Sequence, residues 1–466
     1  MRKQGVQTLL LALFLGVVQA VAESPKVPRL DFTDQRLENG LRVLIAPDHS
    51  APVFAIAVTY NVGSRNERPG RTGFAHLFEH MMFQGSENVG KGEHFILILN
   101  NGGGMNGTTN EDRTNYFEEL PKNQLDLALF LEADRMRSLA VNQANVDNQR
   151  NAVQEERRLS IDNQPYGKAE LEIDNLSYDN FAYKHSTIGS MADLDAASVD
   201  DVKDFFRIYY APNNAAVALV GDLDPQEALE KVKKYFAAIP SQPAPPKVDL
   251  AEPEHYGERR EVIYDPLARL PQLLISYHIP PGDTPENFQV QVLASILGGG
   301  GFGGGFGGGG FGGGQSSRFY QHLVKEKQLA VSIQVRPEAR IGPSLLEIIA
   351  TPRPGVRPEE LEKAIYEEIE AVQKDGVTTQ EIEKARNQYL RSQIQGRQSA
   401  MSTAIRLGQY AVFFNDPDLI NTSFDKFNAV TEEQVKQAAQ RYLVLSARAV
   451  VTTLPVKAQA KSAAGR

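Results

Sequence analysis

The strongest signal in this 466-residue chain is the stretch Gly73-Phe74-Ala75-His76-Leu77-Phe78-Glu79-His80-Met81-Met82-Phe83. If it is helical, His76 and His80 lie four residues apart on one face, so both imidazoles can bind one metal ion. Glu79 follows His76 by three residues and projects near the same face. Apolar neighbours on both sides argue against two solvated surface histidines. The spacing therefore predicts a zinc-binding helix with a carboxylate beside the metal.

These three side chains indicate the chemistry of peptide hydrolysis. Zinc lowers the pKa of water towards neutrality and polarises a peptide carbonyl. A glutamate within reach of that water can take its proton and pass it to the leaving amine. We therefore expect hydrolysis by zinc-activated water with Glu79 as general base. A catalytic zinc normally has three protein ligands, so a further ligand is required.

The order HxxEH is typical of the inverzincins, and the chain resembles the pitrilysin family, which includes insulin-degrading enzyme and the mitochondrial processing peptidases. The resemblance is to the short two-domain members and extends over nearly the whole chain after residue 22. It implies an α+β fold with two related α/β-sandwich domains joined by a Pro-rich linker. Further family-like stretches are residues 105–109, 131–136, 209–214, 221–224 and 316–321.

The resemblance also implies a third zinc ligand, a glutamate on a later helix. The matching stretch here is Asn151-Ala152-Val153-Gln154-Glu155-Glu156, and its alignment with the family's hydrophobic run selects Glu156. Glu155 is the neighbouring alternative, but the two side chains point about 100° apart on a helix, so only one can face the metal. We expect one Zn²⁺ per chain, bound by His76, His80 and Glu156, and Glu155 on the surface. Where the family often has a supporting acid, this chain has Gln149.

Residues 105–109 resemble an edge strand beside the zinc helix. An extended peptide could add to such a strand through backbone hydrogen bonds. Asn106 is the candidate substrate contact; the alternative is a plain turn residue after Gly102-Gly103-Gly104. The expected substrate is therefore a peptide or an unfolded polypeptide segment.

Two residues that the family uses in its C-terminal half are missing. Members that act alone carry an arginine and a tyrosine seven positions apart, which hold the substrate carbonyl near the zinc. The matching positions here are Val324 and Val331, and valine donates no hydrogen bond from its side chain. The resemblance thus implies the zinc-bearing subunit of a heterodimer, whose homologous partner supplies both residues. The alternative is a self-sufficient homodimer that uses other donors, such as Arg318 or Tyr320.

The chain divides into two halves around a Pro-rich stretch that includes Pro243, Pro245 and Pro246. Such a stretch is typical of an interdomain linker, placed here at residues 241–259. We expect an N-terminal zinc-binding peptidase domain at 23–240, a related C-terminal domain at 260–455 and a disordered tail at 456–466.

Hydrophobic periodicity predicts the elements of each half. In the first half, strands are expected at 41–46, 53–60 and 215–220, and helices from residue 73 and at 124–139, 146–163 and 225–238. In the second half, strands are expected at 273–279, 330–335, 345–350 and 447–453, and helices at 285–297 and through most of 358–442.

Residues 298–314 are all glycine except Phe302, Phe306 and Phe311. A segment of this composition has almost no side chains to bury, so we expect a mobile loop. It contains no GxxxxGK[ST] pattern, which excludes a phosphate-binding loop of that kind. Two explanations stay open for this segment: it is the product of simple repeat expansion, or it is a loop that touches substrate.

The N-terminus predicts export. Arg2 and Lys3 precede an apolar run at residues 9–18, and Ala20-Val21-Ala22 supplies small residues for cleavage. We expect a signal peptide at 1–22, cleaved near Ala22, and a periplasmic or secreted protein without stable membrane insertion. The alternative is an N-terminal membrane anchor. The chain has no cysteine, which excludes a lipoprotein, a disulfide scaffold and a thiol nucleophile.

The charge balance argues against nucleic acid as a partner. The chain has 49 Lys and Arg and 58 Asp and Glu, a formal net charge of −9, and no basic run interleaved with aromatic residues. The leading hypothesis is thus an exported zinc endopeptidase. The rivals are a non-catalytic scaffold subunit of the same fold and a peptide-binding chaperone with structural zinc. A general base at Glu79 would serve neither rival.

Overall fold

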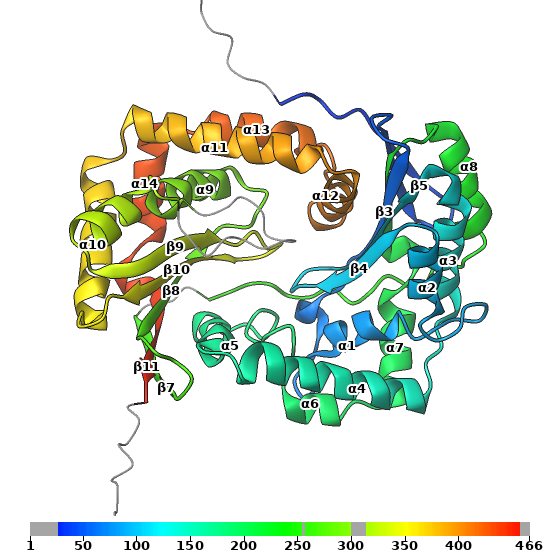
Figure 1. Cartoon of the computed structure of the whole chain (residues 1–466), viewed down its shortest axis with the longest axis horizontal. Coiled ribbons are helices and arrows are strands. Elements are labelled where there is room, and N and C mark those ends of the chain that lie inside the picture. The colour runs from blue at the N-terminus through cyan, green and yellow to red at the C-terminus, as the bar shows by residue number, and fades with distance from the viewer. Residues whose placement is uncertain (1–26, 254–256, 300–313, 457–466) are drawn as a thin grey trace, which may run out of the picture.

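The structure, a computed structural model, describes residues 27–253, 257–299 and 314–456. The expected signal peptide and nearly all of the Gly-rich loop and the tail lie outside these residues. Figure 1 shows two halves, each a sheet with helices against it. Among the described residues, no helix has the length and apolar character needed to cross a membrane.

The N-terminal half contains the first sheet. Its strands are β1 (Thr33–Arg36), β2 (Arg42–Pro47), β3 (Val53–Tyr60), β4 (Gly104–Thr109), β5 (Thr114–Pro121) and β6 (Ala215–Gly221). Its helices are α1 (Phe74–Met81), α2 (Glu93–Asn100), α3 (Leu125–Ser138), α4 (Gln143–Arg157), α5 (Gly167–Ser177), α6 (Met191–Asp195), α7 (Val199–Tyr209) and α8 (Pro225–Phe236).

The C-terminal half contains the second sheet. Its strands are β7 (Arg259–Asp265), β8 (Gln272–Ile279), β9 (Ala330–Pro337), β10 (Ser344–Pro352) and β11 (Arg448–Pro455). Its helices are α9 (Pro285–Gly298), α10 (Pro358–Asp375), α11 (Thr379–Arg397), α12 (Ala400–Phe413), α13 (Leu419–Asn428) and α14 (Glu432–Tyr442). No helix or strand lies between α8 and β7 in the described part of the linker.

The two sheets repeat one topology. In the described chain the first has the order β1-β2-β6-β3-β5-β4 and the second has β7-β11-β8-β10-β9. Apart from β1 the orders correspond strand for strand, and each contains one parallel pair, β2 with β6 and β7 with β11. The remaining pairs are antiparallel. The α+β fold with two related domains is thus confirmed.

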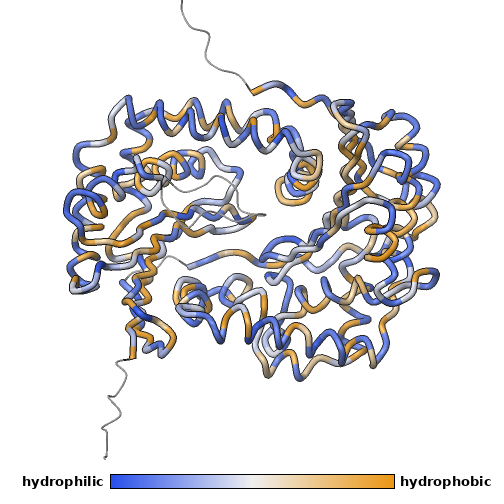
Figure 2. The backbone as a smooth tube through the Cα atoms, in the orientation of Figure 1, coloured by the Kyte–Doolittle hydropathy of each residue, from blue (hydrophilic) through white to orange (hydrophobic). Residues whose placement is uncertain are grey.

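Central strands are buried on both faces. All seven residues of β6 are buried, which explains its unbroken apolar run. One face of the sheet carries large residues that pack on α1, α3 and α8, and the other is dominated by small ones: Ala55, Ala57, Ala216 and Ala218. Figure 2 shows hydrophobic residues concentrated along the strands of both sheets.

The two halves exchange a helix. α12, from the C-terminal half, packs its Ala404, Leu407 and Ala411 on the small-residue face of the first sheet. In return, α5 from the N-terminal half packs Ala169 and Ile173 on Leu274 and other residues of the second sheet. Figure 1 shows α12 beside β3 and α5 beside the second sheet. Sequence periodicity predicted the helix region that contains α12 but not this exchange.

Most predicted elements are present within one to three residues of their expected ends. Residues 146–163 differ: α4 begins earlier, at Gln143, and a π-helical segment, Arg158–Asp162, follows it. Gly298, expected as the first loop residue, is instead buried at the end of α9. The predicted edge strand is confirmed, since β4 lies at the end of the first sheet.

Candidate metal centre

The helix that carries the HxxEH motif is short and firmly packed. α1 follows Gly73, whose φ of +84° suits glycine. Phe78 is buried, with its ring centroid 4.1 Å from that of Tyr210. This apolar face fixes the helix against the core, so His76 and His80 are presented on the opposite, partly exposed side.

Three candidate ligands converge. His76 Nε2 lies 3.6 Å from Oε1 of Glu156, and His80 Nε2 lies 3.3 Å from Oε2 of the same carboxylate. The imidazole centroids are 4.8 Å apart and the rings are nearly perpendicular, at 80°. Bonds of about 2.0–2.1 Å to a tetrahedral zinc place donor atoms roughly 3.3 Å from each other. Because no ligand needs to move far, the three side chains fit a zinc ion.

The two adjacent glutamates of α4, Glu155 and Glu156, point in different directions. Glu156 faces His76 and His80 from this helix, whereas Glu155 points to Arg158, with 3.1 Å between Oε2 and the guanidinium. The Glu155 side chain is 58% exposed. Gln149, one to two turns earlier on α4, interacts with His80 and donates to Asn148 Oδ1. Gln149 stands where the family often has a supporting acid. Its neutral amide cannot give His80 the negative charge that a carboxylate would place beside the imidazole.

Burial and mutual contacts shift the pKa values of the three candidate ligands His76, His80 and Glu156, called here the trio. Burial lowers the pKa of His76 to about 4, and the neighbouring His80 adds to the effect. Burial also lowers the pKa of His80, but the hydrogen bond to Glu156 and the charge of Glu79 outweigh it and raise that pKa overall. The hydrogen bond from His80 holds the pKa of Glu156 below its usual value. Zinc binds the neutral imidazole and the ionised carboxylate, so the shifts of His76 and Glu156 favour binding, whereas zinc must displace the proton that Glu156 and Glu79 stabilise on His80.

Glu79 lies between the trio and the edge strand. Its side chain is buried, and its Oε2 accepts a 2.6 Å hydrogen bond from the Thr109 hydroxyl. A Cβ on Gly107 would lie 3.2 Å from both Cγ and Oε1 of Glu79, so glycine there lets strand and carboxylate approach closely. Burial raises the pKa of Glu79, while Thr109, His80 and Arg113 oppose the rise. A carboxyl group with a raised pKa suits proton transfer near neutrality.

Asn106 is exposed on β4, where its Oδ1 accepts the N–H of Gly107 at 2.9 Å. It occupies a strand, not a turn. Its role as a substrate contact stays a prediction. Thr109, Gly107 and Arg113 were not singled out from the sequence, although Gly107 and Thr109 belong to the family-like stretch 105–109 and so carried a signal.

The positions at which the family has arginine and tyrosine differ in environment. Val324 is buried in the core of the C-terminal half, while Val331 is 50% exposed on β9. Arg318, one alternative donor, is held by Glu381 through two hydrogen bonds of 2.5 and 2.8 Å. Arg318 also donates to the Gly376 carbonyl, so it is already engaged.

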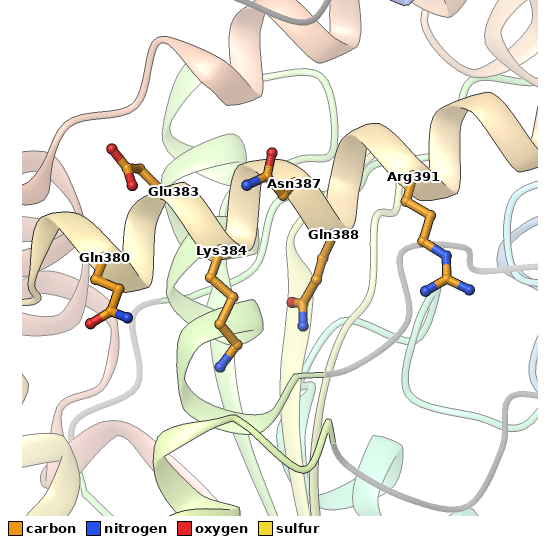
Figure 3. A pocket seen from close by; sticks show the side chains of 6 residues that line it. All are labelled: Gln380, Glu383, Lys384, Asn387, Gln388 and Arg391. Atoms are coloured by element: carbon orange, nitrogen blue, oxygen red, sulfur yellow. The ribbon is translucent and has the colours of Figure 1, made fainter.

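Two other features do not belong to this centre. An open pocket of about 420 Å³ follows one side of α11, where polar side chains such as Lys384 and Arg391 project from the helix (Figure 3). It shares no residue with the trio. Among the described residues, His94, Glu118 and Glu132 also lie close enough to hold a metal, but Arg135 donates two hydrogen bonds to Glu132. A guanidinium in that place repels a cation.

Two family profiles match the chain. The profile described as "Insulinase (Peptidase family M16)" covers residues 42–189, which include all three candidate ligands and Glu79. The profile described as "Peptidase M16 inactive domain" covers residues 196–389.

Relatives and solved structures agree with these profiles. The zinc protease PqqE of Helicobacter pylori is 30% identical over 367 residues, 78% of each chain. A probable mitochondrial-processing peptidase subunit beta of Arabidopsis thaliana is 25% identical over 56% of this chain and 49% of its own. A protease from Helicobacter pylori has a crystal structure with a TM-score of 0.85 and 28% identity, over 92% of this chain and all of that one.

Proposed function

Because the chain belongs to peptidase family M16, we propose that it is an exported zinc-dependent endopeptidase that cleaves peptides or unfolded polypeptide segments. The observation that carries the proposal is the convergence of His76, His80 and Glu156 beside Glu79. These four side chains stand next to an open strand edge, β4, which could receive an extended peptide.

His76, His80 and Glu156 would hold the zinc ion, and their donor spacing supports that assignment. When bound, zinc supplies a Lewis acid that acidifies water and polarises the scissile carbonyl. Glu79 takes a proton from the attacking water at its carboxylate and passes it to the leaving amine. Thr109 keeps that carboxylate in place through its hydrogen bond to Oε2.

Substrate binding is assigned to the free edge of β4. Backbone hydrogen bonds between this edge and an extended peptide would align the scissile bond, and Asn106 would contact the peptide from its exposed position. Recognition through the backbone favours unfolded segments over particular side chains.

We further propose that the active unit is a heterodimer. Val324 and Val331 supply no donors for the developing oxyanion, and Arg318 is held by Glu381. A fold-level comparison supports a two-chain unit: the chain matches 93% of the first half of Escherichia coli PqqL but 48% of the whole, with TM-scores of 0.72 and 18% identity. A homodimer that uses Tyr320 is the alternative.

Export rests on the expected signal peptide at residues 1–22. PqqL of Escherichia coli, which is 26% identical over 59% of this chain and has solved structures, is described as a periplasmic protease and supports this proposal. N-terminal sequencing of the protein from a periplasmic fraction tests this directly. A new N-terminus near residue 23 is expected, and an intact Met1 would contradict cleavage.

The test of activity combines metal analysis with a peptide assay. The purified protein should contain one zinc per chain and cleave an internally quenched peptide in the presence of a homologous partner. Glu79→Gln should keep the zinc and lose cleavage. Unaltered activity in Glu79→Gln would overturn the mechanism, and full activity without a partner would overturn the heterodimer.

A second candidate is a non-catalytic scaffold or peptide-binding subunit of the same fold. The profile described as inactive covers much of the C-terminal half. That candidate predicts peptide binding without cleavage, with and without zinc, and the same assay separates the two.

A further inference from the structure

A buried carboxylate caps the zinc helix from outside the motif. Gly73, the residue before α1, offers no side chain to cap its free N–H groups. Glu67 does so instead: Oε2 accepts the N–H of Gly73 at 2.9 Å and Oε1 accepts that of Ala75 at 2.7 Å. A carboxylate at this end also interacts favourably with the helix dipole. His76 follows Ala75 directly, so the cap lies one residue from a ligand.

His185 holds this carboxylate from the other side. Its Nε2 lies 2.9 Å from Glu67 Oε2 and 3.1 Å from the Ser64 carbonyl, and its Nδ1 lies 2.9 Å from the Phe181 carbonyl. Every one of these partners is an acceptor, so both ring nitrogens must carry hydrogen, which makes the ring an imidazolium. The Glu67 side chain is fully buried and that of His185 is 11% exposed. Glu67 and His185 thus form a buried ion pair.

The segment that carries His185 touches both ligand helices. We call residues 181–189 the strap. At its far end Gly189 packs on Gly73, where a Cβ on Gly189 would lie 2.4 Å from the Gly73 backbone. The Gly189 carbonyl also accepts a hydrogen bond from Arg157, the residue after Glu156. The strap therefore contacts α1 before His76 and α4 after Glu156.

We propose that Glu67 and His185 are positioning residues for the metal centre, which fix α1 relative to α4 and thereby set the spacing of His76, His80 and Glu156. Neither side chain touches the metal in this scheme. The inference rests on the proposed zinc site and adds to it a pair that the HxxEH motif does not contain. Loss of the pair would free the first turn of α1 and loosen the strap, so the three ligands would no longer be held at the distances a tetrahedral zinc requires.

Zinc affinity tests the proposal. In Glu67→Gln the amide keeps the shape, but its NH2 group must face either Ala75 or both Gly73 and His185, all of which already donate. The zinc dissociation constant, measured by competition with a chelator, should rise about 10- to 100-fold. His185→Gln should give a smaller rise, and the double variant should be no weaker than Glu67→Gln alone, because the two residues act as one unit. The visible absorption of the Co²⁺-substituted protein should change in the same variants.

Glu368→Gln is the matched control. Glu368 also pairs with a histidine, His322, with 2.6 Å between Oε2 and Nδ1, but on α10 in the C-terminal half. It should lower stability without changing the zinc dissociation constant or the Co²⁺ spectrum. An unchanged constant and spectrum in folded Glu67→Gln and His185→Gln would overturn the positioning role and leave the proposed function intact.

Amide hydrogen exchange of the metal-free protein separates the two proposals. Glu67→Gln should speed exchange in α1 and in the strap but not in α10. If the native protein binds no zinc, the proposed function and the metal-positioning role both fail, while the exchange result still decides whether the pair secures α1. Exchange equal to the native rate in α1 and the strap would overturn the capping role.

Discussion

Thr109, the last residue of β4, donates its hydroxyl hydrogen to Oε2 of Glu79 on α1 at 2.6 Å. This bond joins the strand edge proposed for the substrate to the carboxylate proposed as general base. A Cβ on Gly107, two residues earlier, would lie 3.2 Å from Cγ and Oε1 of Glu79, so glycine there lets the same strand approach the carboxylate closely. Strand and base are therefore placed as one unit.

Thr109→Val should lower kcat while leaving zinc content unchanged. A hydrogen bond to a charged group contributes about 1.5–3 kcal/mol, so the loss of orientation predicts a roughly 10-fold or larger fall in kcat. Thr109→Ser keeps the hydroxyl and serves as the control, with kcat near the native value. Equal rates in the two variants would show that the bond does not orient Glu79.

Glu156→Gln should weaken zinc binding by more than about 100-fold, beyond the range expected for an outer partner. The reason is that an amide oxygen lacks the charge that a carboxylate brings to the metal. Glu155→Gln, on the adjacent residue, removes an exposed charge paired with Arg158 and should leave zinc binding unchanged. Metal analysis after dialysis against a weak chelator measures both. The reverse order would assign the ligand to Glu155.

Local pattern was enough to predict the motif helix and the helix of Glu156, whereas the edge strand was expected only from the family resemblance of residues 105–109. His76 and His80 are four residues apart, and their meeting requires only one helical turn. The Glu67–His185 pair could not be predicted, because its two members are 118 residues apart and neither belongs to a periodic pattern. Glu67 is polar and fully buried, and only the folded strap shows why.

The helix exchange could not be predicted either, because the surface that buries α12 is distant from it in the sequence. α12 has an ordinary amphipathic pattern, which predicts a buried face but not the sheet that buries it. One signal was present: Ala55, Ala57, Ala216 and Ala218 alternate with larger residues in their strands. A strand face made of alanine leaves room for a closely packed helix, although it does not identify which one.

Gly408→Ala tests how closely α12 approaches the first sheet. A Cβ on Gly408 would lie 2.5 Å from Oγ1 of Thr59 on β3, so the substitution should destabilise the protein by about 1–3 kcal/mol despite alanine's higher helix propensity. Thr59 Oγ1 has no hydrogen-bond partner within the described chain, so Thr59→Ala alone should cost little. The double variant should regain most of the loss in urea unfolding. Simple additivity of the two effects would contradict direct contact.

Glu118 should make stability depend on pH. Burial raises its pKa to about 7, and burial likewise raises that of the nearby Glu132 to about 7. Near pH 5 the folded protein therefore binds protons that the unfolded chain has begun to release. Because the folded-state pKa lies above the unfolded value of about 4.5, the stability that each carboxyl contributes is lost as pH rises from about 4.5 to 7.

Glu118→Gln should remove part of this dependence. Its amide can still share a hydrogen bond with His94 Nε2, which lies 2.5 Å from Glu118 Oε1, because an amide both donates and accepts, but it carries no charge at any pH. When the pH is raised from 5 to 8, the native protein should lose stability that the variant keeps. The difference in unfolding free energy between variant and native protein should therefore shift in favour of the variant by about 2 kcal/mol. Burial lowers the pKa of His94 to about 3, but His94 is common to both proteins and largely cancels. Urea unfolding at the two pH values measures the difference, and a constant difference would mean that Glu118 is ionised throughout.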